Sequence, residues 1–184
     1  MEDLSQLIRD CVAGRPTAQA RLYQLFAPRM YGVCLRYSRD ATEAEDNLQD
    51  GFIKVFEKIG TFRHEGSFEG WMRRIMVNVA LEKYRKQNPL QTVDDISALE
   101  IPDLSEEIIS TISANDLLRL IRELPPRYRM VFNLYVFEGM NHKEIAEEMK
   151  ISDGTSKSNL ARARTILKKQ IRKYFEHTEN NYSA

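Results

Sequence analysis

The chain of 184 residues is long enough for one ordinary domain or for two small ones of about 70–90 residues each. Its 27 basic and 27 acidic residues cancel, so the net charge by itself does not indicate a nucleic-acid partner. No stretch approaches the roughly 18–20 uninterrupted apolar residues of a membrane span, and the N-terminus lacks an apolar signal segment, so we expect a cytoplasmic protein without membrane insertion.

Apolar residues recur at helical spacing through the first half of the chain, and no strand-like alternation persists. The pattern predicts four helices, with N-terminal caps at Thr17 for the second, Thr42 with Glu45 for the third and Ser67 for the fourth. Gly60 is predicted to end the third helix, and the fourth ends before Asn88. Cys11 and Cys34 lie on apolar faces, which indicates two reduced, buried thiols.

The composition changes after this first half. No Lys or Arg occurs between Gln87 and Leu118, and residues 89–107 are acidic, contain two prolines and lack a sustained helical face. We therefore expect an all-α protein with two small helical domains, residues 1–88 and 108–176, joined by a flexible acidic linker at 89–107. Residues 177–184 are polar and are predicted to form a disordered tail.

The second domain ends in a predicted helix-turn-helix. Pro125-Pro126 separates two helices, Asn141 with Glu144 caps a third, and Ser152 caps the last, which runs to about Phe175. The start of an exposed basic helix is where a recognition helix contacts base edges, and here it carries Thr155, Lys157, Ser158, Asn159, Ala161 and Arg162. The alternative is a basic, solvated surface helix that binds no ligand.

Residues that would indicate catalysis or metal binding are not grouped. The three histidines, His64, His142 and His177, are far apart in polar surroundings, and the two cysteines do not have metal-ligand spacing. No glycine-rich phosphate loop occurs. We therefore expect no enzyme activity, no cofactor and no metal.

Several motifs in order resemble the extracytoplasmic function (ECF) sigma factors of bacterial RNA polymerase, and together they extend over nearly the whole chain. Residues 40–56 resemble sigma region 2.2, and Phe62, Ser67-Phe68, Trp71, Arg74-Ile75, Asn78 and Arg85 resemble regions 2.3 and 2.4. Leu124-Pro125, Arg129, Val131-Phe132, Glu138-Gly139 and Glu144-Ile145-Ala146 resemble region 4.1 and the start of 4.2, and residues 151–164 resemble region 4.2.

The resemblance implies core RNA polymerase and promoter DNA as partners, and a possible anti-sigma factor. It implies contacts to the −35 element by Thr155, Lys157, Ser158, Asn159, Ala161, Arg162 and Arg164. For the −10 element it implies His64, Ser67, Trp71, Arg74, Asn78 and Arg85, with the loop 64–67 the better candidate for holding a flipped base. For core polymerase it implies Glu43, Asp46, Asn47, Gln49 and Asp50.

Some alternatives stay open at this point. Phe68 and Trp71 lie on an apolar stripe and fit a core better than a stacking platform. The acidic linker would thread the RNA exit path of the polymerase or would only aid solubility. A stand-alone helix-turn-helix regulator is the second functional hypothesis, and an adaptor that binds polymerase without DNA is the third. Ser156 and Gly51 depart from the family, which usually has Val at the first position and Thr or Val at the second.

Overall fold

The computed structural model describes residues 3–87 and 112–182, with side chains up to Phe175. Every regular element in these two ranges is helical, so the predicted all-α class is confirmed. The chain divides into two compact units, Met1–Lys86 and Gln87–Ala184. The acidic linker predicted at 89–107 lies outside the described residues, and the exact domain boundaries stay a prediction.

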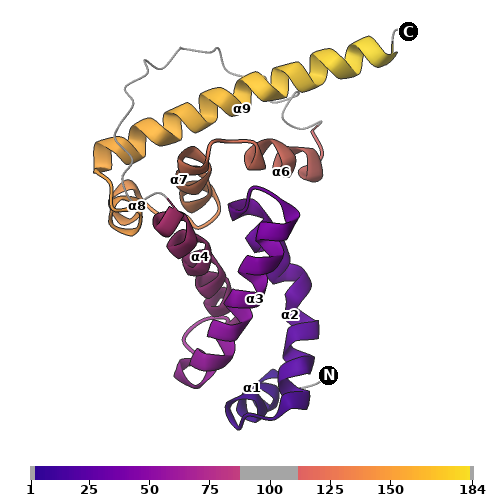
Figure 1. Ribbon diagram of the computed structural model, residues 1–184, viewed down its shortest axis with the longest axis vertical. Helices are drawn as coiled ribbons and strands as arrows, with labels where there is room; N and C mark the ends of the chain where they lie inside the picture. The colour runs from indigo at the N-terminus through magenta and orange to yellow at the C-terminus, as the bar shows by residue number, and fades with distance from the viewer. Residues whose placement is uncertain (1–2, 88–111, 183–184) are drawn as a thin grey trace. The chain divides into compact units, whose positions relative to one another are not determined.

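Unit 1 contains α1 (Leu4–Val12), α2 (Pro16–Tyr37), α3 (Ala41–Lys58), the 3-10 turn η1 (Ile59–Thr61) and α4 (Phe68–Gln87) (Figure 1). Helices α1 and α3 both contact α2, and α1 and α3 also meet η1. Side chains join α4 to the same group, because the Phe26 ring of α2 lies 5.7 Å from the Phe68 ring of α4. The buried core includes Leu22, Met30, Val55 and Met72, each 0–1% exposed.

The Met76 side chain of α4 lies against Gly51 of α3, which explains one departure from the family pattern. A Cβ atom at Gly51 would lie 2.1 Å from the Met76 sulfur, well inside van der Waals contact. The atoms met are the far end of the Met76 side chain, which is 1% exposed and would have to shift within the core. Glycine costs a helix about 1 kcal/mol relative to alanine, and here it allows the two helices to pack with Met76 between them.

Both cysteines are free and buried, so the predicted buried thiols are confirmed. Burial raises the pKa of the Cys34 thiol to about 12, and it also raises the pKa of Cys11. Because the thiolate is the reactive form of cysteine, the two side chains act as apolar core residues at neutral pH.

Unit 2 contains α6 (Ala114–Arg122), α7 (Pro126–Val136), α8 (His142–Met149) and α9 (Asp153–Tyr182). Helix α9, orange to yellow in Figure 1, contacts each of the other three. Its apolar stripe packs against α6, α7 and the turn between them in a core of Leu120, Ile121, Leu124, Tyr128, Ala163, Leu167 and Ile171. Helix α9 therefore holds the other three helices of the unit together.

Several helix ends differ from the predictions. Helix α2 begins at Pro16 rather than after a Thr17 cap, because proline is favoured in the first turn. Helix α3 is capped by Asp40 instead of Thr42, since Asp40 also has a glutamate three residues on and aspartate is the stronger cap. Helix α9 continues to Tyr182, whereas a disordered tail from residue 177 was predicted, and no Pro or Gly interrupts that segment.

Candidate nucleic-acid and polymerase interface

The helix-turn-helix is set by three local features, of which the sequence predicted the two N-terminal caps. Asn141 and Glu144 form a capping box at the start of α8, with Asn141 Oδ1 accepting from the Glu144 N–H at 3.0 Å. Helix α8 ends at Lys150, which adopts the left-handed conformation with φ 55°. Ser152 Oγ then accepts from the Thr155 N–H at 3.0 Å and caps α9. The left-handed Lys150 and the Ser152 cap therefore define where α8 stops and α9 begins.

The first turns of α9 present a polar, basic surface. Lys157, Ser158, Ala161 and Arg164 are exposed, and Thr155 and Arg162 are half-buried. Lys157 forms an ion pair with Asp153 at 2.7 Å, and this hydrogen bond holds the pKa of the Asp153 carboxyl below its ordinary value. Arg162 extends toward α7, where its Nη1 lies 3.4 Å from the Tyr128 hydroxyl.

Asn159 is the exception among the predicted DNA contacts. Its side chain is 6% exposed, so it faces the interior of unit 2, which does not fit its predicted contact with DNA bases. Ser156, Asn159 and Ala163 follow one another at spacings of three and four, and all three are buried. The sequence contains this helical spacing, but asparagine is polar, and the residue was therefore predicted to be exposed.

The sequence analysis also missed two residues beside α9. The His142 ring of α8 hydrogen-bonds the buried Ser156 hydroxyl, with 2.9 Å between Nδ1 and Oγ. The half-exposed Tyr135 ring of α7 stacks on His142, with ring centroids 5.1 Å apart. No sequence pattern singled out His142, because its partner lies fourteen residues further along the chain.

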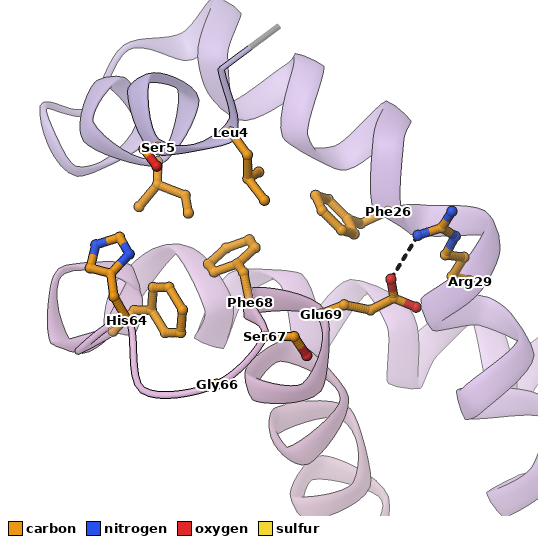
Figure 2. Close-up of a pocket in the computed structure, with 11 residues that line it drawn as sticks. Leu4, Ser5, Phe26, Arg29, His64, Gly66, Ser67, Phe68 and Glu69 are labelled. Carbon is orange, nitrogen blue, oxygen red and sulfur yellow. Dashed lines mark hydrogen bonds and ion pairs between the residues drawn. The ribbon is translucent and has the colours of Figure 1, made fainter. Parts of the chain in front are cut away.

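A pocket of about 440 Å³ lies beside the loop that joins η1 to α4 (Figure 2). It brings together two predicted −10 residues, His64 and Ser67, and it is walled by α1, α2 and the start of α4. His64 and Gly66 have positive φ angles of 59° and 88°, which bend the loop around the opening. The Ser67 hydroxyl is used as the cap of α4, since it accepts from the Gly70 N–H at 3.0 Å.

Aromatic rings surround this pocket. Phe62 lies 5.1 Å from Phe68 and 5.6 Å from Trp71 between ring centroids, and Phe68 stacks on Trp71 at 5.5 Å. Phe68 is 4% exposed, whereas Trp71 is half-buried. Phe68 therefore belongs to the core, and Trp71 keeps one part of its ring accessible. On the far wall, Arg29 and Glu69 form an ion pair at 2.7 Å, drawn in Figure 2.

The remaining predicted −10 residues lie along one side of α4. At about 100° per residue, Trp71, Arg74, Asn78 and Arg85 fall within about 60° of one another around the helix. Arg74 and Asn78 are exposed, and Arg85 is half-buried. The structure thus places these four residues on one face, continuous in sequence with the pocket loop.

The residues predicted to contact polymerase divide into two groups on α3. Asp46 and Gln49 are exposed. Glu43 accepts from the Arg39 N–H at 2.7 Å as part of the cap of α3, and Asp50 pairs with Lys83 of α4 at 2.6 Å. These two carboxylates are half-buried and already have partners inside unit 1.

Asn47 was predicted as a surface residue, and the structure contradicts this. It is 2% exposed, and its Nδ2 donates to the buried Ser38 hydroxyl at 2.9 Å. Ile53, which the sequence analysis did not consider, is 57% exposed on the same side as Asp46 and Gln49. An apolar residue off the apolar stripe was the signal that could have identified it.

Within the described parts of the chain, no group of three or more His, Cys, Asp or Glu side chains could hold a metal ion. Among the same residues, no helix combines the length and the apolar character needed to cross a bilayer.

Two family models match most of the residues of the two units. The family model of sigma-70 region 2 matches residues 22–89, and that of sigma-70 region 4 matches residues 114–167. These ranges include α3, α4 and the helix-turn-helix. They do not include α1 or the part of α9 after residue 167.

Relatives match along most of the chain, and the first two are of similar length. The ECF RNA polymerase sigma factor SigW of Bacillus subtilis is 27% identical, covering 92% of this chain and 97% of its own. The RNA polymerase sigma-H factor of Pseudomonas aeruginosa is 28% identical, covering 92% and 94%. The ECF RNA polymerase sigma factor SigE of Mycolicibacterium smegmatis is 30% identical, covering 85% of this chain and 63% of its own.

A solved structure shares the fold. The sigma factor RpoE from Bartonella quintana, crystallised with the anti-sigma factor NepR, superposes with a TM-score of 0.50 at 21% identity, covering 83% of this chain and 96% of that one.

Proposed function

Because this chain belongs to the ECF group of the sigma-70 family, we propose that its two units contact the two halves of a promoter, unit 1 the −10 element and unit 2 the −35 element. The protein is an alternative sigma factor of bacterial RNA polymerase rather than a stand-alone helix-turn-helix regulator, since regions 2 and 4 both match within one chain. The observation that carries the division of roles is that each matched region lies in its own compact unit with its own polar face.

For the −35 element, the proposed surface is the outward side of α9. Lys157, Ser158 and Ala161 are exposed within the first turns, where a recognition helix contacts bases in the major groove. Lys157 can bind guanine O6 or N7, and Arg164 and Lys168 suit phosphates further along the helix. Arg162 contacts bases after its guanidinium leaves the Tyr128 hydroxyl.

For the −10 element, the proposed site is the pocket beside residues 64–67. A base turned out of the DNA stack would be held by stacking and by hydrogen bonds to its edge, and this pocket supplies aromatic walls and the His64 imidazole. The exposed Arg74 and Asn78 of α4 lie along the path of the strand that leaves the pocket, where positive charge favours phosphates.

For core polymerase, the proposed surface is Asp46, Gln49 and Ile53 on α3. A small apolar anchor within an acidic, hydrogen-bonding stripe suits a partner helix with basic and apolar side chains. Glu43 and Asp50 border this surface and are engaged by contacts inside unit 1.

The remaining roles follow from the family. Sigma factors are not catalysts of the chemical step, and we propose the same for this protein, which acts with polymerase in the cytoplasm. An anti-sigma factor is a further possible partner.

Transcription from a library of promoters with purified core polymerase tests the proposal. We expect the free protein to bind promoter DNA weakly and the holoenzyme to initiate at promoters that share a −35 and a −10 sequence. Tight, sequence-specific binding by the free protein that core polymerase leaves unchanged would contradict it. Limited proteolysis tests the domain boundaries, with cleavage expected first within residues 89–107.

A further inference from the structure

A polar contact inside unit 2 joins the first helix of the helix-turn-helix to the second. Ser156 is 0% exposed, although it lies in a helix whose buried stripe is otherwise mostly apolar. Its hydroxyl lies 2.9 Å from His142 Nδ1, at the first residue of α8. A buried hydroxyl without a partner costs about 1–3 kcal/mol, so this hydrogen bond constrains both side chains.

A second contact, further along α9, continues the same chain of side chains. The Tyr135 ring at the end of α7 stacks on the His142 ring, with an angle of 25° between their planes. The Arg164 guanidinium also lies over the Tyr135 ring, 5.6 Å from its centroid. Ser156 and Arg164 are eight residues apart, about two turns of α9. We call Ser156, His142, Tyr135 and Arg164 the bridging set.

The contacts of the bridging set differ in directionality from those of the apolar core beside it. Apolar contacts between Ala163, Leu167 and their neighbours are not directional, whereas the polar contacts of α9, at Ser156 and also at Arg162 and Tyr174, depend on the rotation of the helix about its own axis. A hydrogen bond to Ser156 is directional and depends on that rotation. Because Lys157 and Ser158 directly follow Ser156, their direction is tied to the position of His142.

We propose that His142 is a positioning residue for promoter recognition: through Ser156 it fixes the rotation of α9 and thereby which side chains reach the bases of the −35 element. This inference rests on the proposed function of α9. The family usually has valine at position 156. Here serine takes its place because its hydroxyl hydrogen-bonds His142.

The test compares promoter-library transcription by holoenzymes that carry His142→Ala, Ser156→Ala or both. Loss of one net hydrogen bond corresponds to about a 3- to 10-fold change, so we expect preferences at the −35 element to weaken by about that factor. Preferences at the −10 element should stay the same. The double variant should resemble each single variant, since both remove the same contact.

Two further variants separate positioning from general stability. His142→Asn retains a side-chain amide near the position of Nδ1 and should restore most of the −35 preference. Glu147→Gln changes an exposed side chain of the same helix and should leave the profile unchanged. If His142→Ala does not fold, as judged by circular dichroism, Ser156→Ala supplies the measurement, because alanine is well tolerated inside a helix.

The possible outcomes are distinguishable. A uniform fall in transcription at all promoters, with an unchanged −35 profile, would overturn the positioning role while leaving the proposed function of α9 intact. A wild-type holoenzyme without any −35 preference would instead overturn the proposed function on which the inference rests. A weakened −35 profile that His142→Asn restores is the expected result.

Discussion

Helices α3 and α9 each have to pack against their own unit and present a binding surface, and they meet this demand in different ways. Helix α3 packs on α4 through a glycine, Gly51, with ion pairs such as Asp50–Lys83 along the edge. Helix α9 packs through an apolar stripe, with a buried hydrogen bond at one end and the contacts of Tyr174 near the other.

The difference shows which kind of change each helix is sensitive to: added side-chain volume at α3 and rotation of the helix at α9. Beside Gly51 the Met76 side chain occupies the space, so volume is restricted there, and the ion pair of Asp50 with Lys83 lies at the edge. Around α9 the apolar contacts are supplemented by directional ones, and the contact at Ser156 is the one nearest the proposed DNA-facing residues Lys157 and Ser158. In both helices one asparagine predicted to face a partner, Asn47 or Asn159, faces inward.

The largest effect is expected on the exposed side of α3. Asp46→Arg with Gln49→Ala should weaken binding to core polymerase by about 100-fold, because a reversed charge opposite a basic surface costs several kcal/mol. Helicity and the free energy of unfolding should not change, since both side chains are exposed. Titration of core polymerase with labelled protein gives the dissociation constant.

Two controls define the surface. Glu45→Arg reverses an exposed charge about 100° around α3 from Asp46 and should bind core polymerase normally. Ile53→Ala should weaken binding by more than about fivefold, which corresponds to a cost of about 1 kcal/mol. Equal effects of Glu45→Arg and Asp46→Arg would show that only net charge matters.

The next effect concerns the seam between α3 and α4. Gly51→Val should lower the free energy of unfolding by about 1–3 kcal/mol, because the new side chain overlaps Met76. In a Met76→Ala background the same substitution should cost clearly less, since the space is then open. Denaturant unfolding measures all four proteins, and additive costs would refute a specific clash between residues 51 and 76.

A smaller effect is expected on α9. Arg162→Ala should reduce the preference for one base pair of the −35 element by about 1–3 kcal/mol. Lys168→Ala, which removes a proposed phosphate contact, should weaken promoter binding nearly equally at all sequences and lower the salt slope by about one. Library transcription and salt titration of the holoenzyme distinguish them, and a uniform loss for Arg162→Ala would reassign it to phosphate.

The smallest effect is expected where α6 meets α9. Hydrogen bonds from Ser113 and Tyr174 hold the pKa of the Asp116 carboxyl below its ordinary value of 3.8. The stabilisation is therefore present above pH 3.8 and is lost as the pH falls through the lower, folded pKa.

The melting temperatures of wild type and Asp116→Asn test this contact. Their difference should be small, and it should shrink as the buffer is taken from about pH 6 to pH 3. A difference that stays constant with pH would mean that the Asp116 charge does not contribute.

Local patterns predicted much of both units. The capping residues Ser67, Asn141 and Ser152 were identified correctly, because a cap depends on side chains within about three residues. Two overlapping capping patterns, at Asp40 and Thr42, could not be separated by spacing, and the stronger cap prevailed. The pocket at residues 64–67 was anticipated only as a loop, since its walls come from α1 and α2 as well.

The sequence by itself determined the helical class, the helix-turn-helix and the family, because these depend on periodicity, caps and motif order along the chain. The tertiary structure decided which polar residues near a helix boundary face inward, as at Asn47, Asn159 and Ser156. Periodicity defines a helix face only to within about one residue, or 100°, and the packing of the neighbouring helices settles the rest. The contacts of Ser156 with His142 and of Gly51 with Met76 join residues distant in the chain, so only the fold could bring them together.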